Sequence, residues 1–159
     1  MTPTGGPGGH DAHEAPGGTV GQYDKGAAMM RRVYGGIVPP LPEGAMPFND
    51  VMVRSLFAEV WDRDVLSVRD RRLLLMGVIA AAGATDVWRI QAAAALANGE
   101  LSPDELRETL IILAPYAGYP NVAGLVLSCE EAINDWRANG GGTAGDGATG
   151  EGATAGGEP

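Results

Sequence analysis

The sequence predicts an all-α fold, and three observations lead to this prediction. Apolar residues recur at helical spacing in several segments. Residues that typically start and stop helices bound those segments. No segment alternates apolar and polar residues between hairpin turns, the pattern typical of β-strands. We therefore expect a compact domain of six helices over residues 22–138 of the 159-residue chain.

A proline-rich connection separates the first two expected helices. The first spans 22–34 and ends at Gly35-Gly36. The sequence Pro39-Pro40-Leu41-Pro42 cannot lie inside a helix, because proline lacks the backbone N–H donor. The second helix is expected from about Asn49 through Trp61. Its apolar residues have helical spacing: Met52, Leu56, Phe57 and Val60.

The third and fourth helices have recognisable ends. Ser67 and Asp70 have the spacing of a capping box, so the third helix is expected to begin at Ser67 and to end at Gly83. The fourth is expected to begin at Thr85, with Thr85 as its N-cap. It ends at Asn98-Gly99, which is a helix-stop signal.

The fifth helix has the clearest start. Ser102 is the expected N-cap, Pro103 occupies the first helical position, and Glu105 completes a capping box. This helix is expected to end within 115–118, and a sixth follows over 121–138.

Two helices are apolar on nearly every side. They are the third, over Leu73–Ala82, and the fifth, over Leu110–Pro115. A helix of this kind is buried all round. Two interpretations follow: both helices form the core of one compact bundle, or part of their surface packs against other subunits.

Composition and charge exclude several classes of protein. The Gly-rich ends, 1–21 and 139–159, hold too few large apolar side chains to form a core, so we expect both to be disordered. The formal net charge of −9 without a basic stripe argues against a nucleic-acid partner. Cys129 is the only cysteine, which excludes a disulfide or a cysteine-rich metal site, and we expect it to be a buried, small apolar side chain. No signal peptide or membrane span is visible, so we expect a cytoplasmic protein with no membrane partner.

A series of short motifs runs along the expected domain. In chain order they are Lys25-Gly26 with Arg32-Val33-Tyr34-Gly35, Glu59-Val60-Trp61 with Arg63 and Leu66, Arg71 with Leu73, Ala95-Leu96 with Asn98-Gly99, Glu105 with Glu108, and Tyr116-Ala117-Gly118-Tyr119-Pro120. By their order and spacing the chain resembles the carboxymuconolactone decarboxylase family, in its gamma-carboxymuconolactone branch within the AhpD-like superfamily.

The resemblance implies a function and an assembly. Members of this family are small helical homo-oligomers, typically hexamers built as trimers of dimers. The decarboxylase removes CO2 from a carboxylated butenolide in the breakdown of aromatic acids and gives an enol-lactone, with no metal or organic cofactor. That chemistry needs an arginine for the substrate carboxylates and an acid that delivers a proton to carbon.

Three positions depart from the family pattern. In the register set by Arg71, a family Glu falls on Val87 and two family His residues fall on Gln91 and Ile112. Glutamine does not titrate, so it orients a partner but carries no proton. The CxxC pair of the peroxidase branch falls on Ala84 and Val87, which excludes a thiol peroxidase.

Seven residues remain as candidates for a site between helices near Gln91. We expect catalytic roles for Gln91, Arg71 and Tyr116, substrate-binding roles for Trp88, Tyr119, Asp86 and Glu108, and no metal ligand. Each has a structural alternative. Arg71 either holds a substrate carboxylate or pairs with Glu59 or Glu108, Asp86 stabilises a helix N-terminus, and Trp88, Gln91 and the two tyrosines pack in the core or at an interface.

Two functions follow from these residues. The first is a cofactor-free lyase or isomerase that acts on a small carboxylated cyclic compound, with a changed substrate or reaction because of Gln91 and Val87. The second is a non-catalytic, oligomeric binding or scaffold member of the same family.

Overall fold

The computed structural model describes residues 19–142 of the chain. Its helices are α1 (Thr19–Tyr34), α2 (Pro47–Met52), η1 (Val53–Trp61), α3 (Val68–Ala82), α4 (Thr85–Ala97), α5 (Pro103–Ala117) and α6 (Tyr119–Ala138). No strand occurs within the described range, and the prediction of an all-α fold is confirmed. Most of the two expected disordered tails, 1–18 and 143–159, lies outside the described residues.

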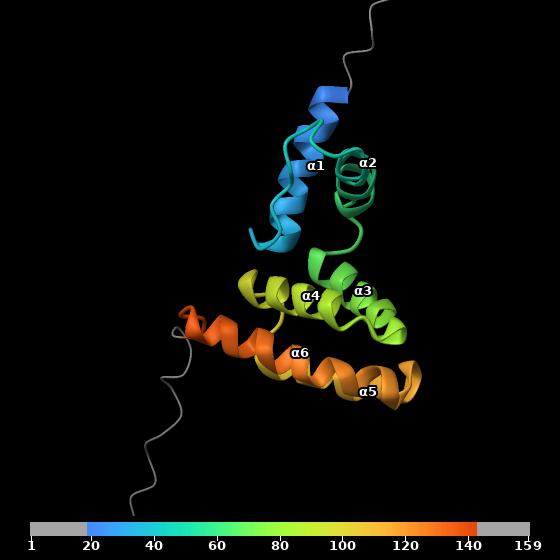
Figure 1. Cartoon of the computed structure of the whole chain (residues 1–159), viewed down its shortest axis with the longest axis vertical. Coiled ribbons are helices and arrows are strands. Elements are labelled where there is room, and N and C mark those ends of the chain that lie inside the picture. Colours follow the sequence, from blue (N-terminus) through green and yellow to red (C-terminus); the bar gives the residue numbers. More distant parts are fainter. Residues whose placement is uncertain (1–18, 143–159) are drawn as a thin grey trace, which may run out of the picture.

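The helices form two packed groups (Figure 1). Helix α1 lies against η1, and these two helices enclose a small core that includes Tyr23, Met30 and Phe57. Helices α3 to α6 pack on one another around a larger core that includes Trp88 and Leu125. The C-terminal end of α1 reaches α4, where the two groups meet.

Local capping chemistry sets most helix ends. Ser67 and Ser102 each form the expected capping box, at the starts of α3 and α5. Gly83 ends α3 with a φ of 62°, a left-handed conformation that glycine adopts without strain. The expected N-cap of α4 is wrong: Ala84 holds that position without a side-chain cap, and Thr85 is the first helical residue.

Other helix bounds differ from expectation by two or three residues. Helix α1 begins at Thr19 rather than at residue 22. Helix α6 begins at Tyr119 rather than at residue 121, because Gly118 alone forms the break between α5 and α6. Helix α2 begins at Pro47, two residues before Asn49.

The second expected helix changes its winding along its length. It is α-helical over α2 and π-helical over η1, without an interruption between the two. The change occurs where α1 packs closely on this helix: a Cβ built on Gly26 would lie 2.0 Å from the carbonyl oxygen of Val53. Only glycine allows this contact, so the packing of α1 on η1 depends on Gly26.

Helices α3 and α5 are not buried on every side in the single chain. Leu74 and Val78 on α3 are 65% and 68% exposed, and Ile111 on α5 is 65% exposed. These side chains form what we call the outer apolar faces. Among the described helices, none combines the length and the apolar character that crossing a membrane requires.

Candidate functional site

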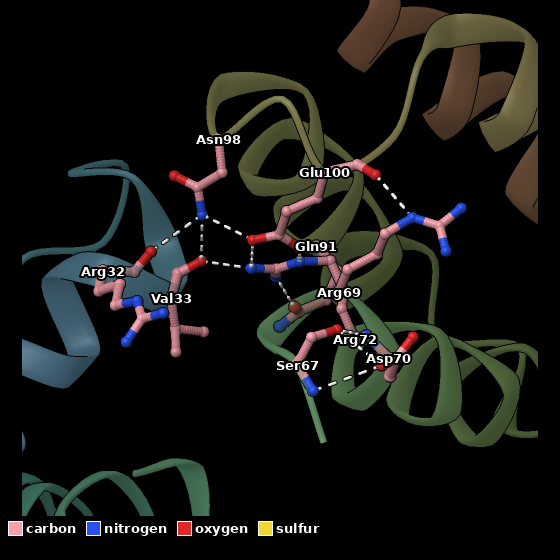
Figure 2. Close-up of polar contacts among 9 residues, drawn as sticks. All are labelled: Arg32, Val33, Ser67, Arg69, Asp70, Arg72, Gln91, Asn98 and Glu100. Atoms are coloured by element: carbon pink, nitrogen blue, oxygen red, sulfur yellow. Dashed lines mark hydrogen bonds and ion pairs between the residues drawn. The ribbon is translucent and has the colours of Figure 1, made fainter. Parts of the chain in front are cut away.

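Gln91 is a buried side chain within a polar cluster (Figure 2). The Gln91 side chain comes from α4 and is 2% exposed. Its Oε1 accepts a hydrogen bond from Nη1 of Arg72 at 2.6 Å. Arg72 comes from α3, is fully buried, and also donates through Nη2 to the carbonyl oxygen of Val33 and to Oε1 of Glu100.

Two more side chains complete this Arg72 cluster, which consists of Arg72, Gln91, Asn98 and Glu100. Nδ2 of Asn98 donates to Oε1 of Glu100 at 2.8 Å and to the carbonyl oxygens of Arg32 at 2.9 Å and Val33 at 3.1 Å. The ion pair of Arg72 and Glu100 has side chains that are 0% and 10% exposed. The cluster therefore fastens the C-terminal end of α1 to α3 and α4.

The geometry of the cluster limits what it does chemically. Its buried charge is paired, which is the condition for placing an arginine inside a protein. Gln91 accepts a hydrogen bond but has no titratable group that could transfer a proton. Gln91 thus orients Arg72 and is itself held by it.

Arg71, the arginine that the motifs indicated, has different surroundings. Its Nη2 donates to the carbonyl oxygen of Arg63 at 2.9 Å and its Nε to that of Leu66 at 3.2 Å. Neither of the expected acidic partners, Glu59 and Glu108, contacts Arg71. Oε1 of Glu59 instead accepts a hydrogen bond from Nε2 of Gln22 at 2.6 Å. Through these two hydrogen bonds Arg71 stabilises the conformation of the loop between η1 and α3.

Trp88 and Cys129 lie together inside the larger core, and both are fully buried. The indole N–H of Trp88 has no hydrogen bond of standard geometry in the described part of the chain. It does come near enough to the thiol to lower the pKa of Cys129 slightly, against a larger rise that burial causes. The expectation of a buried Cys129 is confirmed, and its raised pKa keeps it in the thiol form near neutral pH.

Three further candidates lie on the surface of the single chain. Tyr116 and Tyr119 are 84% and 70% exposed. Tyr119 lines an apolar groove of about 350 Å³ between α5 and α6. Asp86 is exposed in the first turn of α4, where a carboxylate stabilises the helix N-terminus. The structure therefore places the predicted residues in different surroundings: Tyr119 lines this groove, and Glu108 lines a separate pocket.

That pocket lies between α3 and α5 and has a volume of about 390 Å³, within the usual range for small-molecule sites. We call it the α3–α5 pocket. Its apolar lining consists of Leu73, Met76, Leu101, Ile112 and Leu113, and its polar lining of Arg69, Glu105, Glu108 and Thr109.

Most polar groups of the α3–α5 pocket already make hydrogen bonds within the chain. Arg69 donates through Nη2 to Oε1 of Glu105 and through Nε to the carbonyl oxygen of Glu100, both at 2.9 Å. The capping bonds from Ser102 lower the pKa of Glu105, and Arg69 lowers it further. The side chain of Glu108, by contrast, makes no hydrogen bond or ion pair with residues 19–142.

Comparison with known proteins assigns this helical chain to a family. The model of the carboxymuconolactone decarboxylase family matches residues 47–129, which is more than half of the chain. The chain belongs to the carboxymuconolactone decarboxylase family. It is similar to 4-carboxymuconolactone decarboxylase of Acinetobacter baylyi, with 32% identity over 88 residues that cover 55% of this chain and 65% of that relative. The match thus spans slightly less than two thirds of the relative.

In this member of the carboxymuconolactone decarboxylase family, the structure draws attention to two residues that sequence reasoning did not single out: Arg69 lines the α3–α5 pocket, and Arg72 is the centre of the buried contacts. A signal for Arg72 was present. It precedes Met76 and Ile79 by four and seven residues, and all three share the buried face of α3. An arginine on such a face requires buried polar partners, which Glu100 and Gln91 provide.

Proposed function

We propose that this chain is a carboxymuconolactone decarboxylase-like, cofactor-free lyase or isomerase that acts on a small carboxylated cyclic compound in the α3–α5 pocket. The observation that carries the proposal is the combination, in one pocket of about 390 Å³, of an apolar floor with an arginine and two carboxylates. Membership of the family and the name of the A. baylyi relative support the class of reaction.

The residues of the pocket match the needs of a decarboxylation. A guanidinium has five N–H donors, and Arg69 uses two atoms for Glu105 and the Glu100 carbonyl, so it keeps donors for a substrate carboxylate. Leu73, Met76 and the other apolar side chains pack against the ring of the substrate. They also exclude water from the carboxylate that leaves as CO2.

The remaining predicted residues have supporting roles in this proposal. Gln91 orients Arg72, and Arg71 shapes the loop that leads into α3. Asp86 stabilises the N-terminus of α4 from its first turn, and Trp88 anchors the same helix in the core. The change of substrate or reaction relative to other family members follows from a Gln91 that is held in a buried cluster and carries no proton.

We also propose that the chain forms a homo-oligomer, a hexamer built as a trimer of dimers. The outer apolar faces support it, since Leu74 and Val78 leave a large apolar surface on α3 exposed, and Tyr116 and Tyr119 extend this surface at the α5–α6 turn. Light scattering after gel filtration is expected to give the mass of six chains. A monomer at micromolar concentration would refute this assembly, and Leu74→Glu is expected to dissociate it.

The test of the activity uses 4-carboxymuconolactone as the probe and release of CO2 as the readout. Wild-type protein is expected to release CO2, and Arg69→Gln is expected to raise KM by tenfold or more because a charged hydrogen bond to the substrate is lost. A matched control is Arg89→Gln, since Arg89 pairs with Glu131 and Asp135 on α6 and does not line the pocket. Absence of CO2 release from the wild-type protein counts against the proposal.

The alternative function is a non-catalytic binding or scaffold member of the family. One observation favours it: the register position of a family histidine holds Gln91, which is locked in the Arg72 cluster. Calorimetric titration with the same probe separates the two functions. Binding without CO2 release supports the alternative, whereas binding with release supports the lyase.

A further inference from the structure

We infer, on the basis of the function proposed above, that Glu108 is the catalytic residue that transfers the proton in the α3–α5 pocket. Its side chain lines the pocket, and the positions where the family pattern has histidines hold Gln91 and Ile112. The sequence alone predicted that Glu108 binds the substrate. The role inferred here is a different one, transfer of a proton.

The hydrogen bonds of the pocket select Glu108 from its polar groups. Glu105 accepts from the backbone N–H of Ser102 at 2.8 Å and from Arg69, bonds that favour the ionised carboxylate. The hydroxyl of Thr109 donates to the carbonyl oxygen of Leu106 at 2.6 Å. An arginine keeps its proton in proteins. Glu108 is therefore the one titratable side chain of this pocket that no described residue engages.

The position of Glu108 on α5 fits the role. It precedes Ile112 by four residues, so the two side chains lie on one face of the helix, and both line the pocket. Ile112 is the register position of a family histidine. A proton donor at residue 108 thus lies on the same face of α5 as residue 112, one helical turn before it. Ile112 itself adds to the apolar lining of the pocket.

The step balances without a cofactor. Arg69 holds the substrate, and the bond between the ring carbon and its carboxylate breaks, so that CO2 leaves and the electron pair moves into the conjugated lactone. Glu108 then passes a proton to the ring carbon and recovers one from water, so its carboxyl group is unchanged at the end of the cycle. The sum is one carboxylate plus one proton giving one enol-lactone and one CO2.

The experiment compares three variants of the full chain with 4-carboxymuconolactone as the probe. Glu108→Gln keeps the shape of the side chain and is expected to lower kcat by about 100-fold or more, the usual size of a general acid contribution, with KM changed less than threefold. Glu108→Asp is expected to recover part of kcat. The matched control is Asp104→Asn, on the same helix with a side chain that is 93% exposed and outside the pocket, and it is expected to stay within twofold of wild type.

The possible outcomes separate this inference from the proposed function. If the wild type releases CO2 and Glu108→Gln keeps kcat within threefold, the inference is wrong and the lyase activity stands. If kcat falls equally in Glu108→Gln and Asp104→Asn, the effect is not specific to the pocket, and the inference is again wrong. If the wild type releases no CO2, the proposed function fails, and the inference fails with it. Thermal unfolding of each variant shows that the fold is retained.

Discussion

Replacing Arg72 with methionine is expected to destabilise the fold by about 3–5 kcal/mol, the usual loss when one partner of a buried ion pair is removed. Arg72 is fully buried and bonds to Glu100, Gln91 and the Val33 carbonyl. Methionine fills part of the volume but satisfies none of these groups. The Glu100 carboxylate, only 10% exposed, would keep just the hydrogen bond from Asn98.

That loss is large relative to the total free energy of unfolding. A domain of this size is stable by about 5–15 kcal/mol, so the variant has a much smaller margin against unfolding. At roughly 4 °C per kcal/mol for a domain of this size, the melting temperature is expected to fall by about 12–20 °C. The double variant Arg72→Met with Glu100→Gln is expected to recover about 1 kcal/mol or more, because it no longer leaves a carboxylate unpaired.

The assay is urea unfolding followed by circular dichroism, with Arg71→Met as the matched control. Arg71 is the neighbouring residue in α3, is partly exposed, and bonds only to the carbonyl oxygens of Arg63 and Leu66, so its loss is expected to cost about 1 kcal/mol. Equal losses for Arg71→Met and Arg72→Met would refute the reasoning. So would a double variant that is less stable than Arg72→Met alone.

Three further predictions concern packing, pH and thiol chemistry. Gly26→Ala is expected to lower the melting temperature because its Cβ meets backbone of η1, whereas Gly21→Ala, with nothing within 4 Å, is expected to be neutral or stabilising. Because the pKa of Glu105 is lowered in the folded state, its carboxylate contributes fully to stability above its ordinary pKa, and this contribution is lost as pH falls through the folded-state pKa. The variant Ser102→Ala removes one cause of the lowered pKa, so it is expected to lose less stability than wild type when the pH of an unfolding experiment is lowered. Cys129, whose pKa burial raises, is expected to react with a chromogenic disulfide reagent only in urea, and rapid labelling of the native protein would contradict its burial.

Sequence reasoning predicted the fold well where the chemistry is local. Capping boxes at Ser67 and Ser102 and the left-handed Gly83 involve residues within one helical turn, so a single sequence contains all the information. The π-helical winding of η1 was not predicted. It accompanies the close approach of Gly26 to the Val53 carbonyl, a contact between segments about thirty residues apart.

The candidate site was harder to predict, because neighbouring residues on a helix point in different directions. Arg71 and Arg72 are adjacent, yet one bonds to a surface loop and the other lies in the core. Motifs drew attention to Arg71, whereas helical spacing from Met76 and Ile79 would have selected Arg72. The α3–α5 pocket needs two helices that are not consecutive to lie side by side, which no local pattern encodes.

The identity of residue 91 follows from the arginine that faces it. A protonated imidazole beside a buried guanidinium would place two cations together, and a carboxylate would compete with Glu100 for the same partner. Glutamine supplies a neutral oxygen to Nη1 of Arg72 and adds no charge to the cluster. While Arg72 is buried there, residue 91 cannot serve as a proton donor without a cost in stability. In the proposed reaction the proton therefore comes from a group outside the Arg72 cluster, and the side chain of Glu108 in the neighbouring pocket makes no hydrogen bond with residues 19–142.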